Sequence, residues 1–120
     1  MSVDRAVARR TVDRYLEAAN SGDVDALVGL FAIDGEVIHA TRGKAKGTAA
    51  LQAFYTESLA PRPHLAVARL AIDGPYAVAE IVGTSGRDGS KMGVVDHFTL
   101  GEDGSIRRNA VYLGGPLEQD

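Results

Sequence analysis

Cysteine is absent from this chain of 120 residues, and no long apolar run is present. Without cysteine there is no disulfide, no thiolate metal ligand and no cysteine nucleophile. Charged residues recur through the first fourteen positions, where a secretion signal would need an unbroken apolar stretch. No segment approaches the length of a membrane span. We therefore expect a cytoplasmic protein that does not use a membrane as a partner.

An excess of positive charge is also lacking. The chain has 13 basic and 16 acidic residues and a net charge of -3, so nucleic acid is not an expected partner. The hydrophobic fraction of 45% is typical of a globular protein. A chain of this length is long enough for one core and too short for two ordinary domains. We expect a single domain over residues 1–120.

The spacing of apolar residues predicts three helices followed mainly by strands. Helices are expected over residues 2–19, with Ser2 as the cap and Asp4 in the first turn, from residue 24 to Phe31, and from a Thr48 cap to Pro61. Strands are expected over residues 36–41, 65–72, 76–84, 91–100 and 105–113. Residues 34–35 are expected to form a turn, and residues 42–47 a loop.

The order of these elements predicts an α+β fold. The last four strands follow one another with short links, which is typical of an antiparallel meander. The helices are expected to pack against one face of a curved antiparallel sheet and, with it, to enclose an apolar pocket.

Asp96 is the first candidate for chemistry. Side chains alternate along a strand, so Asp96 shares the apolar face with Val94, Phe98 and Leu100. Burial of an ionised carboxyl is costly, so Asp96 is either paired or held protonated with a raised pKa. The alternative is a structural aspartate that bonds to backbone near a strand end.

Tyr15 and His39 are the next candidates. Tyr15 lies on the apolar stripe of the first helix, where its hydroxyl needs a buried partner, although core packing alone would explain its position. His39 alternates with Val37 and is expected to face the interior, where an imidazole is suited to general-base chemistry. A structural, hydrogen-bonded histidine is the alternative.

Other polar residues point less clearly to a site. His97 is expected to face away from Asp96, and His64 lies in a proline-bounded loop, so no metal site or other cofactor is expected. Residues 42–47 (RGKAKG) do not match a phosphate-binding loop. A solvated basic loop is the usual interpretation of such a segment, with anion binding as the alternative.

Several of these segments together resemble bacterial Δ5-3-ketosteroid isomerases. The similar segments are residues 12–16 (VDRYL), 20–25 (NSGDVD), 47–51 (GTAAL), 54–55 (FY) and 95–98 (VDHF). Those enzymes belong to the superfamily of SnoaL-like and nuclear transport factor 2-like proteins, which are cone-shaped α+β barrels. The resemblance covers nearly the whole chain and implies this fold, with a homodimer as the expected assembly.

The resemblance also implies roles for particular residues. In the isomerases a tyrosine and a protonated aspartic acid bind the substrate carbonyl, and Tyr15 and Asp96 match these positions. The catalytic base is an aspartate there and is His39 here, so His39 would take its role. Residues expected to contact substrate are Phe31, Tyr55, Phe98 and Asn109, the last of which stands where methionine is common.

Three functions are compatible with this pattern. The first is a Δ5-to-Δ4 isomerase acting on a 3-oxosteroid or a similar small apolar enone, with His39 as the base. The second is an epoxide hydrolase or polyketide cyclase in which Asp96 acts as a general acid. The third is a non-catalytic protein that binds a steroid or another small apolar ligand.

Overall fold

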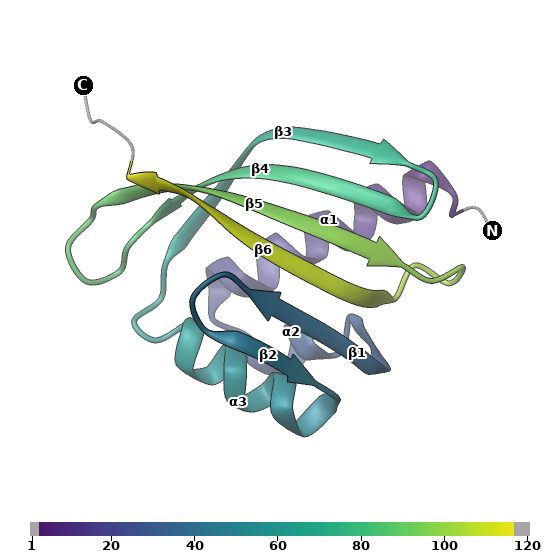
Figure 1. The fold of residues 1–120 in the computed structure, drawn as a ribbon, viewed down its shortest axis with the longest axis horizontal. Helices are drawn as coiled ribbons and strands as arrows, with labels where there is room; N and C mark the ends of the chain where they lie inside the picture. Colours follow the sequence, from purple (N-terminus) through teal and green to yellow (C-terminus); the bar gives the residue numbers. More distant parts are fainter. Residues whose placement is uncertain (1–2, 117–120) are drawn as a thin grey trace.

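Three helices pack on a six-stranded sheet in the computed structural model, which describes residues 3–116 (Figure 1). The helices are α1 (Arg5–Ser21), α2 (Val24–Val28) and α3 (Thr48–Ser58). The strands are β1 (Phe31–His39), β2 (Gly43–Lys46), β3 (His64–Asp73), β4 (Tyr76–Thr84), β5 (Lys91–Leu100) and β6 (Ile106–Pro116). The predicted α+β fold, with a curved sheet and three helices, is confirmed.

The strand order in the sheet is β2-β1-β6-β5-β4-β3. Strands β3 to β6 form the predicted antiparallel meander. Strand β1 pairs with β6 in parallel, so the sheet is mixed and not wholly antiparallel as predicted. These two strands are far apart in sequence, and no hairpin turn constrains their relative direction. Their pairing completes the sheet beside α3.

Helix α1 begins at a polar cap and buries its apolar stripe. The Asp4 side chain accepts hydrogen bonds from the backbone N–H groups of Ala6 and Val7, so Asp4 is the cap and not a first-turn residue. Ser2, the predicted cap, lies outside the described residues. Gly22 ends the helix with φ of 70°, a left-handed conformation that glycine adopts without strain.

The region between α2 and α3 differs from the prediction. Phe31 begins β1 and is not on a helix face, because α2 ends at Val28. Residues 34–35 lie inside β1 at a register irregularity and do not form a turn between elements. The predicted loop 42–47 contains β2, which pairs with β1 as a hairpin. Thr48 is the first residue of α3 and not its cap, because the cap position is Gly47 and no side chain accepts a capping hydrogen bond there.

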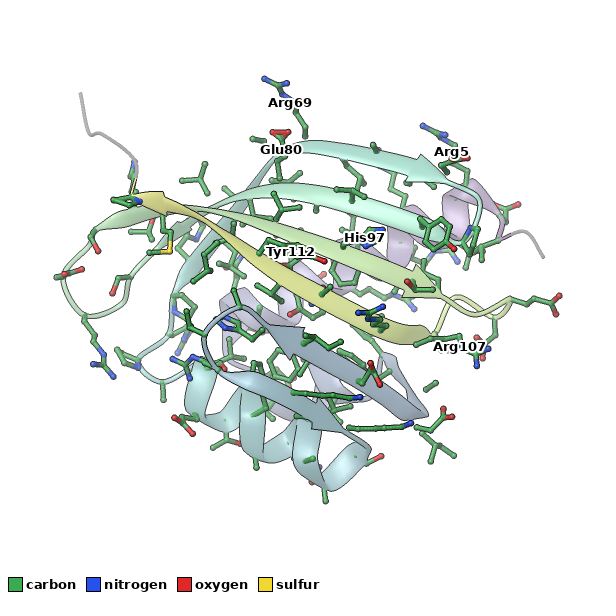
Figure 2. The ribbon with its side chains drawn as sticks, viewed as in Figure 1. Arg5, Arg69, Glu80, His97, Arg107 and Tyr112 are labelled. Atoms are coloured by element: carbon green, nitrogen blue, oxygen red, sulfur yellow. The ribbon has the colours of Figure 1, made fainter. Side chains whose placement is uncertain are left out.

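The core lies between the helices and one face of the sheet. Its largest fully buried side chains are Phe98, Leu27, Leu51, Leu100, Ile106, Val12, Val37 and Asn109. The opposite face of the sheet carries Tyr112 on β6 and His97 on β5 (Figure 2). Among the helices of residues 3–116, none is long and apolar enough to cross a membrane.

Candidate active site

A cavity of about 190 Å³ opens between α1, α3 and the inner face of the sheet. Its walls are mostly apolar, and include Ala19, Leu59, Leu65, Val94, Val111 and Leu113. Tyr15, Tyr55 and Asp96, at the inner end, are almost fully buried. His39, Arg42 and Ser58 line the same cavity but are half-buried or exposed, so they form its mouth. The cavity is therefore polar at both ends and apolar between them.

The two tyrosines at the inner end are hydrogen-bonded to each other. The Tyr15 and Tyr55 hydroxyl oxygens are 2.9 Å apart, and Asn109 Nδ2 donates to the Tyr15 hydroxyl at 3.2 Å. Burial raises the pKa of both phenols, so both keep their protons at neutral pH. If Tyr55 donates to Tyr15, the Tyr15 oxygen accepts two bonds and its own proton is free. Tyr15 can then donate to an oxygen atom in the cavity.

Asp96 lies on β5 and lines the same cavity as these tyrosines, close enough for its charge to raise the pKa of both phenols. Its side chain shares the buried face with Phe98 and Leu100, as the strand alternation predicts. Burial raises the pKa of the Asp96 carboxyl to about 7, and a hydrogen bond from Asn109 opposes this rise. At neutral pH both forms of Asp96 are populated, which suits a group that gives and takes a proton.

His39 is at the end of β1, with its ring tilted against Phe54 at a centroid distance of 6.0 Å. Its Nδ1 accepts hydrogen bonds from the backbone N–H groups of Thr41 at 3.1 Å and Arg42 at 3.2 Å. An imidazole nitrogen that accepts N–H bonds carries no proton, so the neutral ring has its proton on Nε2. Burial, and secondly the charge of Arg42, lower the pKa of His39 and favour this neutral form.

The structure brings together four of the seven predicted site residues around the cavity: Tyr15, His39, Tyr55 and Asp96. The other three do not line it. Phe98 packs against the Tyr15 ring at 5.1 Å, Phe31 packs against the Tyr55 ring at 5.9 Å, and Asn109 bonds to Tyr15. These three residues support the side chains that face the cavity.

Two residues at the mouth were not predicted as parts of this site. The sequence places Arg42 only in a basic loop, and no pattern in it points to Ser58. The basic composition of residues 42–47 was the available signal, but nothing in the spacing connected it with Tyr15 or Asp96. Within the described part of the chain, no three His, Asp or Glu side chains gather as they would to hold a metal ion.

Comparison with known proteins supports the fold on independent grounds. Residues 12–109 match the model of the SnoaL-like domain family. The chain is similar to SalBIII, an epoxide hydrolase/cyclase-like enzyme with a role in pyran ring formation in the polyether salinomycin. In that comparison the TM-score is 0.83 and the identity 24%, over 95% of this chain and 98% of SalBIII.

Two bacterial structures are similar to a comparable degree. A candidate ketosteroid isomerase from Kribbella flavida has a TM-score of 0.82 and 23% identity, over 98% of this chain and 85% of that protein. A candidate polyketide cyclase from Sinorhizobium meliloti has a TM-score of 0.77 and 23% identity, over 86% of this chain and 94% of that protein. At these identities the likeness shows a shared fold, which supports several chemistries.

Proposed function

The chain belongs to the SnoaL-like domain family. We propose that it is an acid–base enzyme acting on an oxygen atom of a small substrate whose body is apolar. The observation that carries the proposal is the buried Asp96 carboxyl beside the Tyr15 hydroxyl in an apolar cavity. Two such donors in a water-poor site stabilise negative charge that develops on a substrate oxygen. The fold is shared by ketosteroid isomerases, epoxide hydrolase/cyclases and polyketide cyclases.

One candidate reaction is the shift of a Δ5 double bond to Δ4 in a 3-oxosteroid or a similar enone. His39 would remove a proton from the carbon next to the ketone, and Tyr15 and Asp96 would stabilise the dienolate oxygen. The imidazolium would then return the proton to the γ carbon. This mechanism needs an unprotonated Nε2, whereas the backbone bonds to Nδ1 place the proton on Nε2.

The second candidate is acid-assisted opening of an epoxide, with water or a hydroxyl of the substrate as the nucleophile. Asp96 would donate its proton to the epoxide oxygen as the C–O bond breaks, while the nucleophile bonds to the carbon. The nucleophile then loses a proton to solvent, and Asp96 is reprotonated from solvent, which balances the reaction.

Two observations favour the epoxide reaction. The first is the proton on His39 Nε2, which prevents this nitrogen from acting as a base. Epoxide opening begins with an acid and does not need His39 as a base. The cavity of about 190 Å³ is also smaller than the roughly 300–1,000 Å³ of pockets that bury drug-sized ligands. A four-ring steroid would therefore extend through the mouth, whereas a smaller epoxide or hydroxy-epoxide could be enclosed.

Parallel assays of the wild type test the proposal. One follows the ultraviolet absorbance of the conjugated product formed from 5-androstene-3,17-dione, and the other follows consumption of a panel of small epoxides. Asp96→Asn and Tyr15→Phe should each lower the activity that is found by at least about tenfold, since the first replaces an acid proton with a weaker amide donor and the second removes a hydroxyl donor. Saturable binding of the conjugated steroid with no turnover in either assay would instead support a ligand-binding protein.

Variants at His39 separate the two reactions. If His39 is the base of an isomerase, His39→Ala abolishes dienone formation. His39→Asp places here the carboxylate that ketosteroid isomerases use, and should retain or raise the rate of dienone formation. If the reaction is epoxide opening, Asp96→Asn abolishes turnover while His39→Ala leaves substantial activity. Isomerase activity that is unchanged in His39→Ala would contradict the first mechanism.

A further inference from the structure

The mouth of the cavity presents hydrogen-bond donors from a strand, a turn and a helix. His39 is the last residue of β1, Arg42 lies in the turn before β2, and Ser58 is the last residue of α3. Arg42 Nη1 is 3.5 Å from the Ser58 hydroxyl oxygen, so these two side chains are adjacent. The packing of α3 beside β1 and β2 brings these residues together, although they are up to 19 positions apart.

The backbone of the turn after His39 determines which of its ring nitrogens carries the proton. The N–H groups of Thr41 and Arg42 both point at Nδ1, which leaves the other ring nitrogen, Nε2, as an N–H donor. Donation from Nε2 is compatible with a neutral ring. His39 and Arg42 are therefore linked by a backbone hydrogen bond and both offer side-chain donors at the mouth.

The charges around the cavity are separated along its length. Among the described residues that line the cavity, Arg42 is the only cation and Asp96 is the only acidic residue. Asp96 is at the buried end and Arg42 at the exposed end. The acidic partner of Arg42 is Glu57, whose Oε1 is 3.8 Å from Nη1 and whose side chain is 83% exposed. So exposed a pair is weak, and a ligand anion can replace it.

We propose that the natural substrate carries a carboxylate that binds at this mouth, to Arg42, His39 Nε2–H and Ser58, while its reacting oxygen lies between Tyr15 and Asp96. The inference rests on the proposed function, because it assigns the inner end of the cavity to the reacting oxygen. Arg42 supplies charge, and the imidazole N–H and the hydroxyl supply directed donors, which together suit an anion better than a neutral group. The apolar walls between the two ends then contact the body of the molecule.

Three naphthol probes test this inference by calorimetry. They are 6-hydroxy-2-naphthoic acid, its methyl ester and 2-naphthol, which share a phenolic oxygen for the Tyr15–Asp96 pair and differ at the opposite end of the rings. The acid should bind the wild type about tenfold or more tightly than its ester, the usual effect of one hydrogen bond to a charged group. Arg42→Gln should remove this preference and leave the affinity for 2-naphthol unchanged.

Two further variants act as controls. Arg69→Gln removes the same charge from the edge strand β3, where Arg69 pairs with Glu80 (Figure 2), and should keep the preference for the acid. Asp96→Asn should change the affinity for all three probes by a similar factor. Equal binding of acid and ester to the wild type would overturn the carboxylate site and leave the proposed function intact. Failure of all three probes to bind would overturn both.

The role of His39 has a separate readout in long-range ¹H–¹⁵N NMR, which distinguishes protonated from unprotonated ring nitrogens. At neutral pH we expect the proton on Nε2 and none on Nδ1. On addition of 6-hydroxy-2-naphthoic acid the Nε2 resonance should shift, and on addition of 2-naphthol it should not. A proton on Nδ1 in the free protein would exclude His39 from the donor set.

Discussion

Asp96 makes the stability of this protein depend on pH, because burial favours its neutral form. The pKa of the carboxyl is about 7 in the folded chain, against an ordinary value of 3.8. Below pH 4 both the folded and the unfolded chain hold this proton. Between pH 4 and 7 the unfolded chain loses it and the folded chain keeps it, so the free energy of unfolding falls as the pH rises. Above pH 7 both states are ionised and the effect is constant.

Asp96→Asn removes this titration while keeping the size of the side chain. The wild type should therefore lose stability relative to the variant as the pH rises from 4 to 8. The difference between their unfolding free energies should change by up to about 4 kcal/mol. Urea denaturation at several pH values measures this difference. Asp13→Asn, on the exposed side of α1, controls for the loss of one negative charge. A difference that is constant with pH would contradict the assignment.

Asn109 opposes the effect of burial on Asp96. Its side-chain hydrogen bond lowers the pKa of Asp96, while Asn109 Oδ1 is buried with no partner among the described residues. Asn109→Met should raise the pKa of Asp96 above its wild-type value, because the donor is lost and the site becomes less polar. The stability should change little, since the lost hydrogen bonds are offset by removal of an unsatisfied acceptor. Titration of the Asp96 carboxyl carbon by NMR measures the shift, and an unchanged or lower pKa would contradict it.

At the scale of elements, Asn20 joins the end of α1 to the start of β3. Its Nδ2 donates to the Leu65 carbonyl at 2.9 Å, and its Oδ1 accepts from the Leu65 N–H at 2.7 Å. Asn20→Ala breaks both bonds in a half-buried position and should lower the unfolding free energy by about 2 kcal/mol. Gln52→Ala, which breaks one exposed 3.5 Å bond, should change it by less than about 0.5 kcal/mol. Similar values for the two variants in urea denaturation would show that the Asn20 bonds contribute little.

The inner end of the cavity was predictable because its residues follow the regular spacing of a helix and the alternation of a strand. Helical spacing puts Tyr15 on a buried stripe, and strand alternation puts Asp96 on a buried face, so packing that helix on that sheet brings both to the interior. The resemblance to ketosteroid isomerases added Tyr55, which bonds to Tyr15.

The mouth of the cavity and part of the sheet were not predictable in the same way. Strand β2 (GKAK) has two lysines and two small residues and little strand propensity, and its pairing with β1 stabilises it. The parallel pairing of β1 with β6 depends on contacts between residues about 70 positions apart. The protonation of His39 depends on the backbone of the turn that follows it, and the sequence does not specify that geometry.

At the scale of the whole molecule, the sheet has one covered and one open face. The open face carries Tyr112 and His97 (Figure 2). Tyr112 is 55% exposed, and the His97 ring stacks at 5.7 Å on the ring of Tyr76, which is 48% exposed. Val95 is the register partner of Tyr112 and lies on the same face. Exposed aromatic and apolar side chains gathered on one face are typical of a surface that another protein covers.

We propose that two copies of the chain associate through this face as a homodimer. In a dimer with twofold symmetry each side chain near the axis meets its own copy, so Tyr112→Lys would bring two cations together and should yield a monomer. Ile33→Lys makes a comparable change at an 88% exposed side chain near the start of β1 and should leave the dimer intact. Sedimentation velocity over a wide range of protein concentration measures the mass of each. A wild type that stays monomeric at every concentration, or dimers that persist in Tyr112→Lys and dissociate in Ile33→Lys, would rule out this face as the interface.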